Sequence, residues 1–379
     1  MLTGTVESTK PWRNGKKIKP PHLSAEILLF HILPKLPGKS LLRFKCVCKQ
    51  WRSFLATPLF ANIHLHHVTT VDRSRHEKVF FLHKVYTSKS RNYCETVDCE
   101  DGSIAKPCCY PFRGYAMILG SSVNGLLCVG IERRSTSELT DIILWNPLTG
   151  EYKKLSKPID AYRYDEFELF YNCSDDDYKI LSITIFGIVY MYSLKSDSWR
   201  KLESTVDHHG DHIPYAAASD HNLLDGKLHF LTGPGKEGFV IIRLDLKTEK
   251  FTKIRIPRSC RGGSSTLMVV RGCIELTTFK AVSHSWLSRR WTIEMWRMNG
   301  YGDWTNMVNI SYTHDDGIRP LRLMRNGNLI MLTKKDDSSE ICKVDPEKKT
   351  VDVFCSRPEM VFIKIYIETF VSPNQYGVS

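Results

Sequence analysis

Residues 23–60 read LSAEILLFHILPKLPGKSLLRFKCVCKQWRSFLATPLF, and they hold the only strongly helical pattern of the chain. Their apolar residues recur at intervals of three or four, which is the spacing of one helix face. Ser24 can cap the first helix, and Pro34 and Pro37 end it because proline lacks the amide hydrogen that a helix interior needs. A second helix is expected to start at Ser40.

After Ser40, the apolar residues line one face of a helix or of two short helices in series. These residues are Leu41, Phe44, Val47, Cys48, Trp51 and Leu55. Pro58 closes the region, so we expect three short helices. A unit this small cannot bury all of its apolar surface alone. One apolar face is left over, and it packs either on the rest of the chain or on the helices of a partner.

From about residue 78, the pattern changes to short apolar runs separated by turn dipeptides, which indicates an all-β domain with few helices. Three such dipeptides each precede a strand-like run, as expected where a tight turn opens a strand. They are Asn124-Gly125, Asp225-Gly226 and Asn326-Gly327.

A repeat runs through this β domain. It consists of an apolar strand, a polar or proline-bearing turn, and a large apolar residue six positions after the turn begins. Four segments follow it closely and a fifth has one extra residue: Asn146–Tyr152, Ser193–Trp199, Asp245–Phe251, Asp345–Val351 and, with the extra residue, Arg297–Trp304. Successive starts lie 47, 52, 52 and 48 residues apart, close to the ~50-residue period of a four-stranded propeller blade. Five or six blades would fill the domain.

Each such sheet exposes apolar faces that only neighbouring sheets can cover, so a ring of sheets is stable where one sheet is not. The alternative is a pair of packed antiparallel sheets whose hairpins recur. The fold class that we expect is α+β and multidomain: a small three-helix unit followed by a mainly-β, propeller-like domain of repeated four-stranded units.

The stretch from residue 23 to residue 60 resembles an F-box. Family F-boxes carry an L-P pair, acidic residues, an I-L pair, a second L-P pair and then K-S-L-x-R-x-x-x-V-C-K-x-W-R. The matching residues here are Leu23, Glu26, Ile32, Leu33, Leu36, Pro37, Lys39, Ser40, Leu41, Arg43, Val47, Cys48, Lys49, Trp51 and Arg52. Two positions depart from the pattern, because Ser24 stands where the first proline is usual and Pro34 replaces a polar residue. Pro34 should end the first helix a turn early.

Residues 78–372 resemble the F-box-associated domain of a large plant family that is often grouped with F-box/kelch-repeat proteins. The segments that carry this resemblance are 122–127, 144–150, 189–192 with Trp199, 224–229 and 366–372. The kelch label is loose, since Gly262-Gly263 is the only double glycine after the F-box. The expected organisation is a basic flexible tail over 1–21, the F-box over 22–65, a linker over 66–77, the propeller-like domain over 78–372 and a tail over 373–379.

The two resemblances imply the substrate-recognition subunit of an SCF-type cullin-RING ubiquitin ligase. In such a complex the F-box binds a Skp-type adaptor, the adaptor binds a cullin, and a RING subunit brings the ubiquitin-conjugating enzyme. The chain would perform no catalysis and need no cofactor, because holding a target lysine near the conjugating enzyme makes the transfer nearly unimolecular.

The same resemblance implies which residues contact the adaptor. They are Leu23, Ile32, Leu36, Pro37, Leu41, Val47, Cys48 and Trp51. Aromatic residues dominate many interfaces, so Trp51 is the first candidate for an anchor. Its other interpretation is a core residue that holds the helices together, and the sequence leaves both open.

The formal net charge is +12, and part of it lies in the N-terminal tail. The basic residues of the tail are Lys10, Arg13, Lys16, Lys17 and Lys19. Such a tail is a nuclear import signal, a nucleic-acid patch or simply a solvated terminus. A basic nucleic-acid-binding or scaffolding protein without a ligase role is therefore the alternative function, and it predicts binding that weakens steeply with salt. A propeller-type enzyme is a third class, but the sequence has no recognisable catalytic constellation or phosphate-binding loop.

No uncharged stretch approaches the roughly 18 residues that a membrane helix needs, so we expect neither membrane insertion nor export. The 12 cysteines do not form the dense framework of a small secreted domain. This composition favours a reducing compartment, the cytoplasm or the nucleus.

Polar clusters give weaker signals. His64, His66 and His67 alternate along an expected strand, and Asp207 to His212 crowd one loop, but neither predicts a metal because no pair of Cys-x-x-Cys motifs completes a site. The run Asp175-Asp176-Asp177 is either a clamp for a cation or basic target, or a solvated turn. Substrate-binding residues are unknown from the sequence, and the candidate recognition loops are 131–140, 207–220, 233–238 and 281–290.

Overall fold

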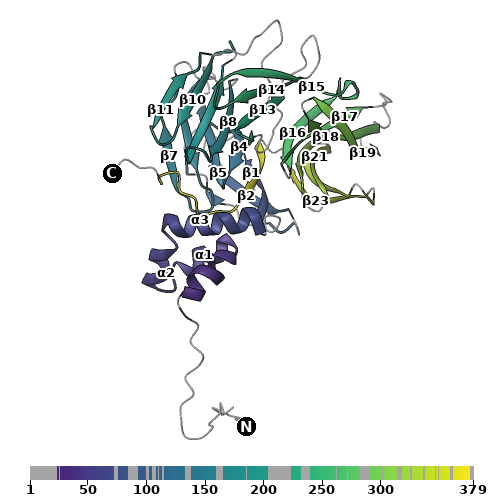
Figure 1. Ribbon diagram of the computed structural model, residues 1–379. Coiled ribbons are helices and arrows are strands. Elements are labelled where there is room, and N and C mark those ends of the chain that lie inside the picture. The colour runs from purple at the N-terminus through teal and green to yellow at the C-terminus, as the bar shows by residue number, and fades with distance from the viewer. Residues whose placement is uncertain are drawn as a thin grey trace, which may run out of the picture.

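A small helical unit precedes a ring of antiparallel sheets in the computed structural model of the chain (Figure 1). The structure describes residues 24–375 except 25, 72–75, 84–92, 100–101, 105–107, 110, 113–114, 133–137, 159–164, 185, 204–222, 232–239, 262, 271, 282–289, 301, 314–317, 325–326, 336–337, 346, 349 and 359–361. The tail over 1–21, with its basic residues, lies outside the described part of the chain.

The helical unit consists of short helices in series. Their bounds are η1 Ile27–Ile32, η2 Leu33–Lys35, α1 Gly38–Phe44, α2 Lys49–Phe54, α3 Pro58–His66 and η3 His67–Val71. Ser24 caps the first helix as expected, since its Oγ accepts the backbone N–H of Ile27 at 3.2 Å. The first helix, the π-helix η1, ends at Ile32, and a single 3₁₀ turn that contains Pro34 follows. The early end that Pro34 predicted is therefore confirmed.

Two expectations about these helices need correction. α1 begins at Gly38, two residues before the expected start. The apolar face divides between α1 and α2, which agrees with the alternative of two short helices in series. Pro58 does not close the region but opens α3, because Thr57 caps that helix by accepting the N–H of Phe60 at 3.1 Å and proline is tolerated at the first helical position. The histidines over residues 64–67 therefore lie on a helix and its end, not on a strand.

The β domain consists of six four-stranded sheets, which we number as blades in chain order. Blade 1 contains β24 Phe362–Ile367, β1 Glu77–His83, β2 Tyr93–Asp98 and β3 Cys108–Cys109. Blade 2 contains β4 Tyr115–Val123, β5 Leu126–Glu132, β6 Leu139–Trp145 and β7 Tyr152–Leu155. Blade 3 contains β8 Glu166–Asn172, β9 Asp177–Ile183, β10 Val189–Ser193 and β11 Ser198–Lys201.

The remaining blades follow the same order. Blade 4 contains β12 Leu223–Leu224, β13 Lys227–Leu231, β14 Val240–Asp245 and β15 Phe251–Arg255, after which the 3₁₀ helix η4 Arg258–Cys260 leads on. Blade 5 contains β16 Ser264–Val270, β17 Cys273–Ala281, β18 Arg290–Gly300 and β19 Asp303–Thr313. Blade 6 contains β20 Ile318–Leu323, β21 Leu329–Lys335, β22 Ser338–Asp345 and β23 Thr350–Pro358.

The ring confirms the propeller prediction and explains the repeat that predicted it. Each repeated segment of the sequence is the hairpin between the third and fourth strands of a blade, such as the turn between β6 and β7. The Asn124-Gly125 dipeptide forms the turn between the first and second strands of blade 2, with φ of 51° and 83° at its two residues. Positive φ at both positions is typical of the type I′ turns that join twisted strands.

The core lies between neighbouring blades. Cys128 and Leu144 of blade 2, for example, pack in one buried cluster with Leu169 and Tyr178 of blade 3. Among the cysteines whose side chains the structure describes, nine are free thiols and Cys94 is disulfide-bonded. Within the described residues, no helix has the length and apolarity required to cross a bilayer.

Candidate functional site

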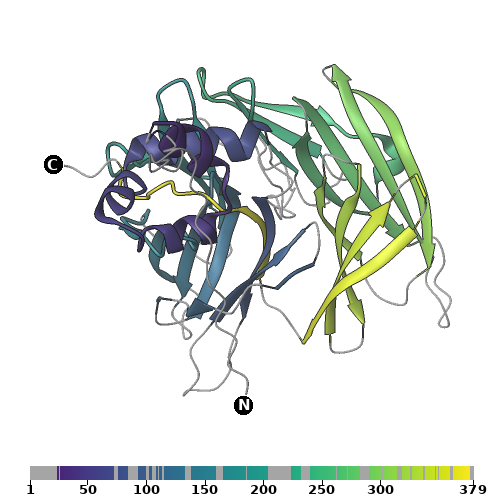
Figure 2. The same cartoon turned by 90° about the horizontal axis from the view of Figure 1, so that it is seen from below.

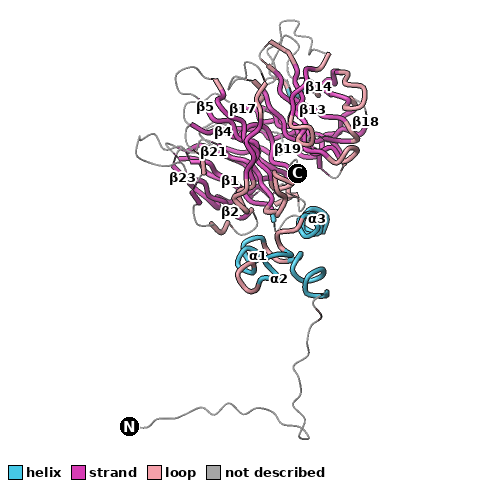
Figure 3. The backbone as a smooth tube through the Cα atoms, turned by 90° about the vertical axis from the view of Figure 1, so that its left-hand side faces the viewer, coloured by secondary structure: helices cyan, strands magenta, loops and turns pink. Residues whose placement is uncertain are grey.

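Both ends of the propeller lie at one seam, beside the helical unit. β24 pairs with β1 to close the ring, and the chain then continues as residues 368–371, which we call the C-terminal strap. The backbone N–H of Glu368 donates to the carbonyl oxygen of His76 at 3.3 Å. Figure 2 shows the helices and the yellow C-terminal segment over the same half of the ring, while the blades from β16 to β23 carry no helices. Figure 3 shows the helices on one side of the strands.

Asn146, in the turn between β6 and β7, holds the strap by its side-chain amide. Its Nδ2 donates to the carbonyl oxygens of Thr369 at 2.9 Å and of Val371 at 2.8 Å. Its Oδ1 accepts the backbone N–H groups of Leu148 at 2.9 Å and Thr149 at 3.3 Å. The side chain is fully buried, so both ends of the amide are paired, as buried polar groups require. The turn and the strap are thereby fastened together.

The turn between β4 and β5 approaches the strap so closely that only glycine fits. A Cβ atom on Gly125 would lie 2.3 Å from Oγ1 of Thr369 and 2.8 Å from the carbonyl oxygen of Ile367. The same Thr369 hydroxyl donates to the carbonyl oxygen of Asn124 at 2.5 Å. The Asn-Gly dipeptide therefore makes a turn and also receives the strap.

The helical unit rests on the strap through Phe370. The ring of Phe370 is buried and contacts the rings of Phe60 at 5.4 Å and His64 at 5.3 Å between centroids. The Nζ atom of Lys45 lies 5.2 Å from the centre of the same ring. Aromatic contacts of this kind contribute about 0.5–1.5 kcal/mol each beyond the area that they bury.

A second contact joins α1 to blade 2. Gly38 at the start of α1 packs so tightly on Leu148 that an added Cβ would lie 2.6 Å from its Cδ2. The next residue, Lys39, has its Nζ 4.0 Å from a carboxylate oxygen of Glu368. The helices, the turn and the strap are thus packed as one body.

This contact excludes water, and the burial shifts the pKa values of two titratable groups. Burial, and after it the electrostatic interaction with His76, lowers the pKa of His64 to about 3, so the ring is neutral at pH 7. Burial raises the pKa of the Glu368 carboxyl, while the charges of Lys78 and Lys39 oppose that shift. Both shifts arise from removal of a charge from water.

One residue expected to contact a partner lies in the core instead. Leu41 has 0% of its surface exposed and packs with Leu33, Leu55 and Phe60. It faces inward because the helices bury that side against the strap. Leu41 supports the helical unit and is not available to a partner in this structure.

The other expected contacts differ in exposure. Pro37, Val47 and Cys48 are exposed, whereas Ile32, Leu36 and Trp51 are half-buried. Val47 exposes 60% of its surface, and Cys48 caps α2 by accepting the N–H of Trp51 at its sulfur. Trp51 packs on Phe44 at 5.4 Å between centroids, so it serves the core and still presents part of its ring. Leu23 lies outside the described residues.

Three further apolar residues of the helical unit are exposed, and sequence reasoning did not single them out. Ile27, Phe30 and Leu59 expose 46%, 37% and 55% of their surfaces. Leu59 was missed because Pro58 was interpreted as an end instead of a helix start. The helices therefore have two apolar faces. The inward face packs on the strap, and the outward face is exposed.

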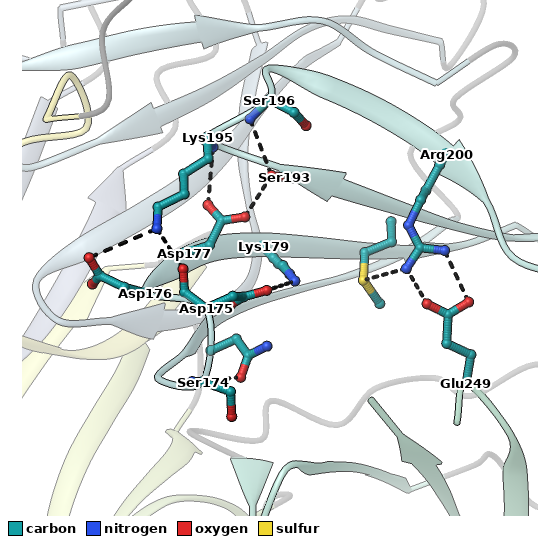
Figure 4. A network of polar contacts seen from close by, with 12 residues as sticks. Ser174, Asp175, Asp176, Asp177, Lys179, Ser193, Lys195, Ser196, Arg200 and Glu249 are labelled. Carbon is teal, nitrogen blue, oxygen red and sulfur yellow. Dashed lines mark hydrogen bonds and ion pairs between the residues drawn. The ribbon is translucent and has the colours of Figure 1, made fainter. Parts of the chain in front are cut away.

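The acidic run over residues 175–177 pairs with lysines of its own blade (Figure 4). The pairs in this region are Asp175 with Lys179, Asp176 with Lys195, and Arg200 of blade 3 with Glu249 of blade 4. Asp177 is buried and accepts the backbone N–H of Lys195 at 3.1 Å. Asp175 and Asp176 are exposed, as expected of a solvated turn, whereas Asp177 is buried within the blade. The polar loop over 207–212 lies outside the described residues, and the described ones contain no group of three metal-binding side chains.

The strand ends next to the four loops expected to recognise a target lie at one rim of the ring. In a four-stranded antiparallel blade, the first and third turns lie at one rim and the other connections lie at the opposite rim. The first and third turns of blade 2 hold the strap, so the helices lie at that rim. The strand ends that flank positions 131–140, 207–220, 233–238 and 281–290 lie at the other rim. Most of the loop residues themselves lie outside the described part of the chain.

The structure has helices on one rim of a six-bladed ring. Comparisons with known proteins agree with this arrangement of two parts. Residues 120–374 match the family described as F-box associated beta propeller domain, and residues 26–66 match F-box-like. The chain belongs to the F-box-associated β-propeller family. Its helical unit is the F-box, and the propeller follows it.

Curated relatives are similar over most of the chain. An F-box/kelch-repeat protein of Arabidopsis thaliana is 24% identical over 93% of this chain and 97% of its own length. An F-box protein of the same plant is 26% identical over 76% of this chain and 72% of its own length. Among solved structures, TolB from Acinetobacter baumannii is similar over 82% of this chain and 73% of that chain, with a TM-score of 0.50 and 11% identity, which supports the propeller fold alone.

Proposed function

We propose that this F-box protein is the substrate-recognition subunit of an SCF-type cullin-RING ubiquitin ligase. Its F-box binds a Skp-type adaptor, which links it to the cullin and RING subunits, and its propeller binds the target. The observation that carries the proposal is the division of the F-box surface: the inward face is fixed on the strap, and apolar residues on the helices remain exposed.

The adaptor surface that we propose consists of exposed and half-exposed side chains of the F-box. These are Ile27, Phe30, Ile32, Leu36, Pro37, Val47, Cys48, Trp51 and Leu59. Large exposed apolar side chains on rigid helices are typical of protein interfaces. A site in the cytoplasm or nucleus, where cullin ligases work, is part of the same proposal.

In this proposal, the adaptor binds on the F-box at one rim of the propeller and the target binds at the opposite rim. Because the strap fixes the F-box at one rim, a target bound at the opposite rim would be held at a set distance from the adaptor. A rigid connection raises the effective concentration of a target lysine near the conjugating enzyme. The chain needs no catalytic residue for this role, and we propose that it is not an enzyme.

A pull-down with a purified Skp-type adaptor tests the proposal. The full chain is compared with Val47→Lys/Leu59→Lys, which alters only exposed side chains, and with Met307→Lys on the propeller as a matched control. We expect the chain and the control to retain the adaptor, and the double variant to lose at least about 30-fold in affinity, as the loss of about 2 kcal/mol at an anchor site would give.

Salt distinguishes this function from the alternative of nucleic-acid binding. If the folded chain bound no adaptor but bound RNA or DNA with an affinity that fell steeply with salt, the ligase role would be abandoned. If the double variant retained the adaptor, we would conclude that the adaptor does not bind at these exposed residues.

A further inference from the structure

Each blade ends in an outer strand whose far edge has no neighbour in its sheet. Proteins usually protect such edges with short strands, lysine or proline. Most outer strands here follow that rule. β3, β7, β11 and β15 have two, four, four and five residues, and the last three of these carry Lys or Arg. β23 has nine residues but includes Asp352, Arg357 and Pro358.

β19 departs from this rule. It has 11 residues, and its only charged residue is Asp303 at the start. A bulge at Met307 interrupts the pairing with β18, because Met295 pairs with Val308 and Trp296 pairs with Asn306. Beyond the bulge, the six residues Val308–Thr313 pair without interruption with β18. Their sequence, Val-Asn-Ile-Ser-Tyr-Thr, is uncharged and rich in residues that favour strands.

The segment is held rigidly on its inner side. Ile310 is buried and packs, together with Val308, in the core cluster between blades 5 and 6. Asn309 and Ser311 are exposed. Every second residue of an edge strand presents its backbone N–H and C=O outward, so this edge offers preset hydrogen-bonding groups. Within the described part of the chain, β19 ends its sheet and these outward groups meet no other strand.

The position of the edge suits a partner. Blade 5 lies three blades from blade 2 in the ring of six, on the side away from the strap and the F-box. Figures 1 and 2 show β19 at the outer side of the propeller, opposite the helices. A chain bound there would not compete with the F-box for space.

We propose that the outer edge of Val308–Thr313 binds an extended segment of another protein as an added strand. The main chain of the segment supplies the hydrogen bonds, and side chains at alternate positions supply specificity. A second copy of this chain is the weaker occupant, because two chains of net charge +12 repel each other. A neutral or acidic segment rich in β-branched residues fits the uncharged edge. The proposal goes beyond the ligase role and stands without it.

A synthetic peptide provides the test. It alternates valine and threonine over eight residues, and its N-methylated form, with methyl groups on alternate amides, has the same side chains without the hydrogen-bond donors. Hydrogen exchange of the full chain is measured with each peptide. At a peptide concentration ten times Kd, we expect the backbone amides on the outward edge of Val308–Thr313 to exchange about tenfold more slowly with the first peptide and not with the second.

Two variants separate the edge from other sites. Asn309→Lys/Ser311→Lys places charge on exposed positions of β19 and should abolish the slowing. Thr350→Lys/Asp352→Lys, at exposed positions of β23, is the matched control and should retain it. Equal slowing by the methylated peptide, or in the β19 variant, would overturn the proposal. Slowing that appears with protein concentration alone, together with dimer in sedimentation, would overturn the choice of occupant.

Discussion

The side-chain nitrogen of Asn146 lies 2.9 Å from the carbonyl oxygen of Thr369, although 223 residues separate the two in sequence. The equivalent turns of blades 4 and 6 carry Asp245 and Asp345, each of whose Oδ1 accepts two backbone N–H groups at 3.0 Å. Asparagine and aspartate can both make this turn, but only the amide can also donate to the strap. The amide is thus specific to the blade that the strap crosses.

Asn146→Asp should therefore destabilise the protein far more than such a small change in the side chain suggests. The variant keeps the turn, loses both hydrogen bonds to the strap, and sets a buried carboxylate against two carbonyl oxygens. We expect the free energy of unfolding, measured in urea, to fall by at least about 3 kcal/mol, because a buried unpaired charge typically costs that much. Asp245→Asn, at the exposed equivalent turn, is the control and should change stability little. Similar losses in the two variants would remove the special role of the strap.

Gly125→Ala isolates the steric contact with the strap. The matched variant is Gly226→Ala, because Gly226 has a φ of +69° in a similar turn but no atom within 4 Å of its added Cβ. Gly226→Ala should lose about 1–2 kcal/mol of stability from its positive φ alone. Gly125→Ala should lose that amount and several kcal/mol more, since Thr369 or the backbone of Ile367 must move. Thermal unfolding of both variants measures the difference, and equal shifts would contradict the contact.

The propeller could be predicted because its hairpins recur at intervals of 47 to 52 residues, close to the length of one blade. In three of these hairpins, a side-chain oxygen of Asn146, Asp245 or Asp345 accepts backbone N–H groups of the turn, which is why these residues recur. The closure of the ring could not be predicted in this way. β1 and β24, which pair to close it, come from opposite ends of the propeller sequence, and no local pattern marks their pairing.

The F-box residues were predicted by resemblance, and their exposure was not. Leu41 and Val47 occupy equally apolar positions of the motif, yet one is buried and the other is 60% exposed. The difference depends on Phe370 and the strap, which come from the other end of the chain. Helical periodicity identifies an apolar face but does not say which part of it the same chain covers.

Stability should fall on mild acidification because of His64. The unfolded chain binds a proton at this residue near pH 6.5, whereas the folded chain does so only near pH 3. The unfolded state therefore holds more protons between these values, and the free energy of unfolding falls as pH is lowered, by up to about 1.4 kcal/mol per pH unit. Well above pH 6.5, His64 is neutral in both states and no longer lowers the free energy of unfolding.

Comparison with His64→Phe measures that contribution. Urea unfolding of both proteins from pH 7 to pH 5 should give a difference in slope that corresponds to about one proton. Glu368 contributes in the opposite direction, because burial raises its pKa, but it is common to both proteins and cancels. Parallel curves for the two proteins would show that His64 gains a charge in the folded state without cost.

Phe370→Ala should release the F-box from the propeller without removing the adaptor surface that we propose. Loss of a buried phenylalanine ring typically costs about 3–5 kcal/mol, and here the loss falls on the contact with Phe60 and His64. Phe186→Ala is the control, since that ring is 74% exposed and should be dispensable for stability.

Limited proteolysis and adaptor binding together test this separation. We expect Phe370→Ala to be cut faster between α3 and β1, while its affinity for a Skp-type adaptor stays within a few-fold of the parent chain, because the exposed residues of the F-box are unchanged. Ubiquitin transfer to a bound target should then fall, since a loosely held F-box no longer sets the distance between target and conjugating enzyme. Unchanged proteolysis in Phe370→Ala would mean that the strap does not hold the F-box in solution.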